Sequence, residues 1–139
     1  MDILGVPFNK FMGVKKNPNC VDGYLLEDQP IYKNHVGTFH AAAIFSLAEA
    51  TSGLFLNDIY KEIEEGSLLP VVKKATAQYK RPATKKITSK NMLGMDEKKR
   101  VVEELKTQRK SYVTVPVTIF NENDEECFLG EFEWVLKMQ

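Results

Sequence analysis

The sequence predicts an α+β fold in which an antiparallel sheet wraps around one long central helix. Residues 41–56 are apolar on almost every face, a pattern typical of a buried helix. After residue 66 several segments alternate apolar and polar side chains with the period of two that strands show. Because no linker, repeat or low-complexity tract divides the chain, we expect a single domain over residues 1–139.

The N-terminal segment is expected to be short and irregular. Residues 1–14 are mostly apolar and predict a short helix packed across an end of the core, made irregular by Pro7. Residues 19–29 predict an extended strand, and residues 31–39 predict a loop.

The central helix is expected to open between Thr38 and His40, with Thr38 as its N-cap. It is expected to end near Glu65, because Gly66 follows as a helix stop. A second, amphipathic helix is expected over residues 96–108.

The remaining elements are expected to be strands. They cover residues 71–80, 86–93, 111–121 and 126–137. Pro116 lies inside the third of these and cannot donate to a ladder. Its strand must therefore lie at an edge of the sheet or be bulged there, or the segment is not a strand.

The composition excludes several classes of protein. The 19 basic and 19 acidic residues cancel, so the chain has no overall attraction for nucleic acid or an anionic membrane. Cys20 and Cys127 form no Cys-x-x-Cys motif, so we expect no metal or redox centre and interpret them as reduced thiols of a cytoplasmic protein. No signal peptide is recognisable, and residues 41–56 are too short to span a membrane.

Glu49 is the only charged residue between positions 41 and 56. Burying an unpaired carboxylate costs several kcal/mol, so such a group is paired, shifted in pKa or placed at a subunit cleft. We interpret Glu49 as a functional carboxylate. The alternative is a structural carboxylate that is hydrogen-bonded to a backbone or tyrosine partner.

The start of the same helix offers complementary chemistry. Backbone N–H groups near Ala41 have no partner within the helix and can hold a carbonyl oxygen and stabilise its oxyanion. Ala41 and Glu49 are separated by about 12 Å along the helix axis, so one carbonyl cannot touch both within a subunit. If the two groups cooperate, a two-fold dimer with antiparallel central helices must bring them together.

The run from Asn34 to Gly53, NHVGTFHAAAIFSLAEATSG, resembles the signature of hotdog-fold acyl-CoA thioesterases. The resemblance is strongest to the phenylacetate-degradation and 4-hydroxybenzoyl-CoA thioesterase branches. In those families an Asn or Gln precedes the oxyanion-hole amide, and an Asp or Glu follows it along the helix. The residues at the matching spacing are Asn34, Ala41 and Glu49. Similarity at 79–83 and 131–136 extends the resemblance over nearly the whole chain.

The resemblance implies a hotdog fold, a homodimer or homotetramer, and hydrolysis of an acyl-CoA thioester with no cofactor beyond the CoA of the substrate. It implies that the Ala41 amide binds the thioester carbonyl and that Asn34 binds the carbonyl or positions water. Glu49 would act as general base or nucleophile. Ser52 is a candidate for orienting the water, with a helix-packing serine as the alternative. His40 matches the family histidine, and we take it as an organiser of the helix start near the substrate.

The oxyanion turn departs from the family pattern. The family has His-Gly-Gly where this chain has His40-Ala41-Ala42. The amide donors are kept, while the added methyl groups crowd the approach to them. Weaker or more selective activity is the expected consequence.

A basic stretch fits a phosphate-bearing ligand such as CoA. Residues 68–95 contain several lysines and one arginine but no acidic residue. Phosphates need such partners, and Lys80, Arg81 and Lys85 are our candidates for binding CoA. The alternative is that these are lysines of a solvated strand edge.

Two other functions remain open on the sequence. A 3-hydroxyacyl dehydratase would pair a loop histidine, here His35, with Glu49 across the dimer, although Asn34 and Thr38 fit the thioesterase signature better. A non-catalytic acyl-CoA-binding module is suggested by the alanines at the oxyanion turn, but the presence of both Asn34 and Glu49 argues against it.

Overall fold

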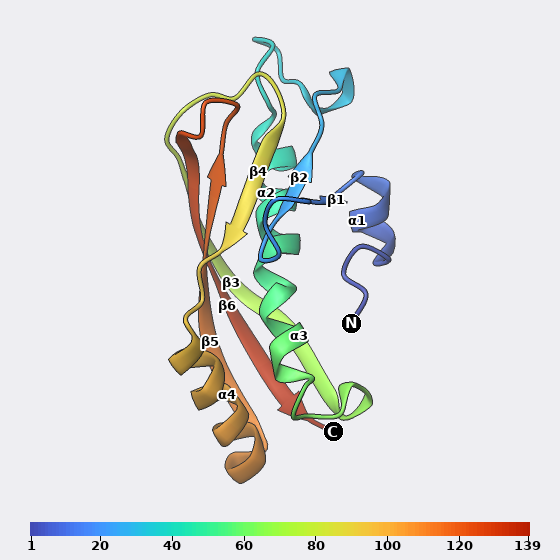
Figure 1. Ribbon diagram of the computed structural model, residues 1–139, viewed down its shortest axis with the longest axis vertical. Coiled ribbons are helices and arrows are strands. Elements are labelled where there is room, and N and C mark those ends of the chain that lie inside the picture. Colours follow the sequence, from blue (N-terminus) through green and yellow to red (C-terminus); the bar gives the residue numbers. More distant parts are fainter.

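The computed structural model describes all 139 residues and contains one antiparallel sheet of six strands in the order β1-β2-β4-β5-β6-β3. The strands are β1 Lys15–Lys16, β2 Tyr24–Leu26, β3 Leu68–Tyr79, β4 Ile87–Asn91, β5 Lys110–Phe120 and β6 Glu126–Met138. The α-helices are α1 Pro7–Phe11, α2 Ala41–Ser52, α3 Leu56–Ile59 and α4 Met95–Gln108. This arrangement confirms the predicted α+β fold with a sheet around a central helix (Figure 1).

Helix α2 lies between the sheet and the N-terminal segment that carries α1 (Figure 1). Leu47 and Ala48 of α2 are fully buried, as are Phe128, Phe132 and Leu136, which alternate along β6 and face the helix side. Burial of these side chains is the main force that holds the helix on the sheet. The position of α2 on the sheet is thereby fixed against β6.

The central helix is shorter than predicted. A 3₁₀ turn, Gly53–Phe55, separates α2 from α3, and α3 ends at Ile59 rather than near Glu65. Asn91 of β4 explains the break, because its side-chain amide donates to the last α2 carbonyls, those of Thr51 and Ser52, at 3.0 Å each. These bonds satisfy carbonyls that a helix end leaves without partners.

The predicted strand over residues 19–29 is also wrong for most of its length. Only Tyr24–Leu26 pair as β2, because turns closed by Cys20 N–H to Asn17 C=O and Gly23 N–H to Cys20 C=O come before it. The chain then passes so near β4 at Gly23 that an added Cβ would lie 1.8 Å from the Ser89 carbonyl oxygen. The other four predicted strands and the helix over residues 96–108 are confirmed, with small shifts of their ends.

Pro116 lies in an interior strand of the sheet, where the sequence predicted an edge strand, a bulge or no strand. Strand β4 pairs with β5 only from Val117 to Phe120, so Pro116 sits just beyond the end of β4. Its carbonyl accepts from Met92 N–H at 2.8 Å, which shows that this edge of Pro116 faces the end of β4 and not β6. The missing proline donor therefore costs no ladder bond.

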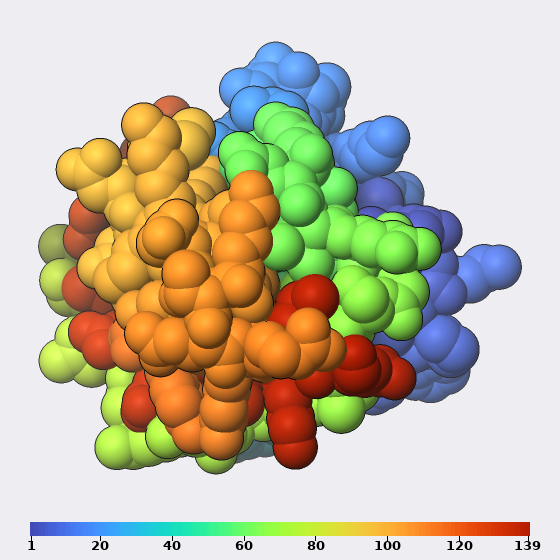
Figure 2. Space-filling view, turned by 90° about the horizontal axis from the view of Figure 1, so that it is seen from below, coloured from blue at the N-terminus to red at the C-terminus, as the bar shows by residue number.

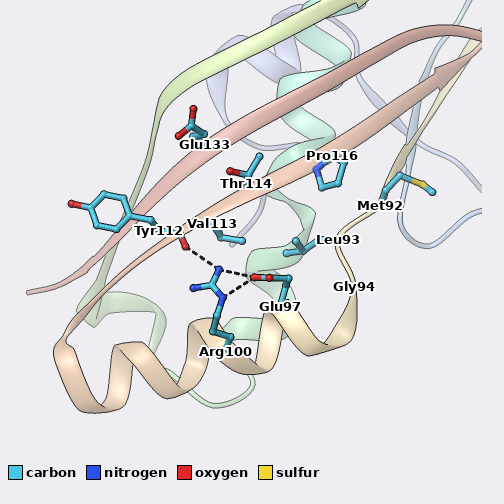
Figure 3. Close-up of a pocket in the computed structure, with 10 residues that line it drawn as sticks. All are labelled: Met92, Leu93, Gly94, Glu97, Arg100, Tyr112, Val113, Thr114, Pro116 and Glu133. Atoms are coloured by element: carbon cyan, nitrogen blue, oxygen red, sulfur yellow. Dashed lines mark hydrogen bonds and ion pairs between the residues drawn. The ribbon is translucent and has the colours of Figure 1, made fainter.

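Helix α4 covers the part of β5 that β4 leaves unpaired. Arg100 donates to the Tyr112 carbonyl at 3.0 Å and pairs with Glu97 at 2.6 Å (Figure 3). At the same end of the molecule α4 lies against the segment around α3 (Figure 2), where Lys98 pairs with Asp58 at 2.7 Å. The helix thus protects a sheet edge and closes the lower end of the core.

Candidate functional site

His40 is the N-cap of α2, in place of the predicted Thr38. Its backbone is extended, and its Nδ1 atom accepts a hydrogen bond from Ala42 N–H at 2.9 Å. The amides of Ala43 and Ile44 bond to the carbonyl of His40. Among the first amides of the helix, only that of Ala41 has no acceptor in the subunit. The helix start therefore presents one free N–H at its positive end.

Asn34 organises the loop that leads into the helix. Its Oδ1 atom accepts from the amides of Val36 and Thr38 at 3.0 Å each, and its Nδ2 atom donates to the Thr38 hydroxyl at 2.8 Å. Gly37 has a φ of 82°, a conformation that favours glycine and lets the loop close on Asn34. One of the two Nδ2 hydrogens remains free, so Asn34 can still donate to a ligand.

Ala41, which carries the free amide, lines a cavity of about 290 Å³ between the loop, α2 and the end of β3. The lining residues are Asn34, Thr38, Phe39, Ala41, Ile44, Tyr79, Lys80, Arg81 and Pro82. The structure thus brings together four of the residues predicted from the sequence, Asn34, Ala41, Lys80 and Arg81. Hydrogen-bond donors and cationic side chains therefore line the same cavity.

Tyr79 also lines this cavity and was not predicted from the sequence. Tyr79 is the last residue of β3, and its hydroxyl donates to the Ala41 carbonyl at 3.2 Å. Partial burial raises the pKa of its phenol, so the group keeps its proton at neutral pH. Its position directly before Lys80 and Arg81 is the only signal in the sequence that could have pointed to it.

The three predicted CoA-binding cations differ in their surroundings. Lys80 pairs with Glu126 at 3.8 Å, and Arg81 pairs with Glu125 at 3.8 Å and donates to the Glu126 carbonyl at 2.8 Å. Lys85 is exposed, forms no ion pair and lies outside the lining of the cavity. All three side chains are exposed to solvent, where such ion pairs exchange at little cost.

Glu49 is half-buried on α2, and its carboxylate has no hydrogen-bond or ion-pair partner within the subunit. Burial alone raises its pKa above the ordinary value. Glu49 does not line the cavity at Ala41. It lies instead on a stripe of incompletely buried α2 residues formed by Ala42, Phe45, Ser46 and Glu49, which have the spacing of one helix face.

Ser52 is buried and its hydroxyl is engaged on both sides. It donates to the Glu49 carbonyl at 2.7 Å and accepts from the indole N–H of Trp134 at 3.0 Å. Both contacts agree with the alternative that Ser52 is a helix-packing serine. They also connect the helix turn that carries Glu49 to strand β6. They leave no hydroxyl hydrogen for a water molecule.

Other features of the structure offer less chemistry. The cavity of about 350 Å³ beside α4 contains Arg100 and Glu97, which already pair with each other (Figure 3). His35 is exposed in the loop. No group of three or more His, Cys, Asp or Glu side chains is arranged to hold a metal ion. No helix has both the length and the hydropathy that crossing a membrane requires.

Comparison with solved structures assigns the fold. A protein of unknown function from Pseudomonas aeruginosa, named a probable thioesterase, has a TM-score of 0.82 at 20% identity, over 99% of this chain and 91% of its own. A thioesterase from Haemophilus influenzae has a TM-score of 0.70 at 15% identity, over 98% of this chain and 86% of its own. A Bacillus halodurans protein crystallised with CoA has a TM-score of 0.66 at 10% identity, over 93% of this chain and 74% of its own. The molecule is a hotdog-fold protein, as the sequence resemblance predicted.

Within that class the sequence also defines a family. Residues 18–136 match the family described as a domain of unknown function, DUF4442, and the chain belongs to it. No curated protein matches the sequence.

Proposed function

We propose that this protein hydrolyses an acyl-CoA thioester to the free acid and CoA, at sites that two subunits build together. The observation that carries the proposal is the pair of complementary groups on one helix. The Ala41 amide is free in a cavity beside Asn34, and the Glu49 carboxylate is half-buried without a partner. The thioesterase names of two structural relatives and the CoA bound to a third support the same chemistry.

In the proposed reaction the thioester carbonyl oxygen accepts from the Ala41 amide, and Asn34 donates to the carbonyl or to the water. Glu49 of the second subunit removes a proton from water as it attacks, or attacks the carbonyl itself and forms an anhydride that water then cleaves. The negative charge that develops on the carbonyl oxygen is stabilised by the amide and by the helix dipole. Collapse of the tetrahedral intermediate breaks the C–S bond, and the CoA sulfur takes up a proton.

A dimer is proposed because two surfaces of the subunit lack a partner. Strand β3 pairs only with β6, so its other edge is open over 12 residues. Long unprotected edges favour pairing with another strand. Pairing of β3 with its copy about a two-fold axis would make the two α2 helices antiparallel on one face of a continuous sheet. The stripe that contains Glu49 would then approach the helix start of the second subunit.

The phosphates of CoA would be bound by Lys80, Arg81 and Lys85 at the mouth of the cavity. Lys80 and Arg81 would exchange Glu126 and Glu125 for phosphate oxygens, which are stronger acceptors. Lys85 has no carboxylate to release. Because these contacts depend on charge, the KM for acyl-CoA is expected to rise with ionic strength.

The proposal is tested by measuring thiol release from short, medium, long and aromatic acyl-CoAs with wild type, Glu49→Ala and Glu103→Ala. Glu103 is a matched control, since it is an exposed helix glutamate without an ion pair. We expect wild type and Glu103→Ala to hydrolyse at least one of these thioesters and Glu49→Ala to lose about 100-fold or more. Equal rates for wild type and Glu49→Ala, or no thiol release by wild type, would contradict the proposal.

The same assay separates hydrolysis from the dehydratase alternative. His35 would be the essential base of a dehydratase, yet it is exposed in its loop. We expect His35→Ala to leave thiol release within about twofold of wild type, because hydrolysis requires no group at that position.

A further inference from the structure

Tyr79 brings a second hydrogen-bond donor to the residue that carries the free amide. Its hydroxyl lies 3.2 Å from the Ala41 carbonyl oxygen, and both residues line the same cavity. Its ring packs edge-on against Phe128, with 5.2 Å between ring centroids, and this contact restricts the orientation of the side chain. The phenol is therefore directed at the helix start by packing.

The bond from Tyr79 to Ala41 is easily exchanged. A distance of 3.2 Å is long for an O–H···O hydrogen bond, whose usual range ends near 3.0 Å. The Ala41 carbonyl lies in the first turn of α2, where it also accepts from an amide one turn later. If the hydroxyl turned away, this carbonyl would still be bonded.

A ligand carbonyl bonded to the Ala41 amide would lie in the cavity that Tyr79 also lines. Tyr79 is 49% exposed, so a ligand can reach its hydroxyl. Neutral phenols are good donors to an oxyanion and need no change of protonation to act. Asn34, whose Nδ2 keeps one free hydrogen, lines the same cavity.

We infer that the Tyr79 hydroxyl donates to the carbonyl oxygen of the bound acyl group, beside the Ala41 amide, and so completes the oxyanion site. This inference rests on the proposed function and adds a substrate-contacting residue to it. Two donors from different elements, the start of α2 and the end of β3, also restrict where the carbonyl oxygen can lie. A donor of this kind acts mainly on the transition state, where the charge on the oxygen is largest.

The first test compares Tyr79→Phe with Tyr112→Phe. Tyr79→Phe removes only the hydroxyl and keeps the ring on Phe128. Tyr112 is also 49% exposed and lies on β5 by the α4 cavity, so its hydroxyl is a matched control. We expect Tyr79→Phe to lower kcat by roughly 10- to 100-fold and to raise KM by no more than about tenfold, and Tyr112→Phe to stay within about twofold of wild type. A Tyr79→Phe kcat within twofold of wild type would overturn the inference.

The second test does not depend on turnover. Calorimetry measures the binding of CoA and of an acyl-CoA analogue in which a methylene replaces the thioester sulfur, leaving a ketone. We expect Tyr79→Phe to weaken binding of the ketone analogue by about tenfold and to leave CoA binding unchanged. If wild type binds the ketone more tightly than Tyr79→Phe but releases no thiol, the hydrolase proposal fails and the inference stands. If the two proteins bind the ketone equally, or wild type binds no ketone, the inference fails.

Discussion

The imidazole of His40 and the amide of Ala42 form the hydrogen bond that decides which donor remains free at the start of α2. Nδ1 of His40 accepts from Ala42 N–H at 2.9 Å, which leaves the amide of Ala41, one residue earlier, without an acceptor. Ala41 and Ala42 are therefore not equivalent. Ala42 serves the N-cap, and Ala41 is the candidate oxyanion donor.

Ala41→Pro removes this donor while respecting the helix. Proline is favoured at the first position of a helix, and the ψ of 138° at His40 is suitable for a residue that precedes proline. We expect Ala41→Pro to fold with an unchanged circular dichroism spectrum and to lose about 100-fold in kcat. Ala41→Gly keeps the N–H and removes a methyl group, so it should be at least as active as wild type. Full activity of Ala41→Pro would rule out the amide as the oxyanion donor.

Asn34 has a structural and a proposed chemical role that two substitutions separate. Asn34→Asp keeps the acceptors for the Val36 and Thr38 amides but removes the Nδ2 donor. We expect it to lower thiol release at least tenfold with a small change in Tm, because the loop keeps both backbone bonds and the Thr38 hydroxyl can rotate to donate to the new carboxylate. Asn34→Ala should lower both, since two loop amides lose their acceptor. If Asn34→Asp keeps wild-type activity, the donor has no part in the reaction.

The burial of Glu49 predicts a stability that depends on pH. Its folded-state pKa is raised, so the folded protein binds a proton there more tightly than the unfolded chain does. Stability from this group is present at low pH and is lost as pH rises through the raised pKa. Glu49→Gln should therefore have a higher Tm than wild type at about pH 7.5, with a smaller difference at about pH 4. Thermal melts at both values check this, and a Tm gain that is larger in acid would be the contrary result.

The raised pKa of Glu49 also predicts how kcat/KM depends on pH on the acid side of its profile. Glu49 must be ionised to act as base or nucleophile, so kcat/KM should rise with pH as the carboxyl loses its proton. Because burial raises this pKa, the midpoint of the limb should lie above the ordinary value of 4.5. A profile of kcat/KM between about pH 4 and 8 measures it. A midpoint at or below the ordinary value would assign the limb to another group.

Periodicity and composition were sufficient to predict the sheet around a central helix. The alternation of β6 and the apolar run of α2 each specify a buried face without reference to distant residues. The end of α2 and the interior position of Pro116 were not predictable in this way, because both depend on tertiary contacts. Asn91 ends α2 by reaching across from β4, and the end of β4 makes Pro116 acceptable within β5.

In the candidate site, too, some residues were predicted from the sequence and others were not. Asn34, Ala41, Lys80 and Arg81 were predicted from the sequence, and all line one cavity. Tyr79 was missed because a strand residue reaches Ala41 only after the sheet has folded. Glu49 was predicted from its charge within an apolar helix, and its carboxylate has no hydrogen-bond or ion-pair partner within the subunit.

Mixing two inactive variants tests the shared site most directly. In a heterodimer of Glu49→Gln and Ala41→Pro, one site keeps the Ala41 amide of the first subunit and the Glu49 carboxylate of the second. Unfolding and refolding an equal mixture should make half of the dimers mixed, each with one intact site, and so restore about a quarter of wild-type activity. A mixture that stays as inactive as its two parents, while size-exclusion chromatography confirms dimers, would contradict a site built across the subunits.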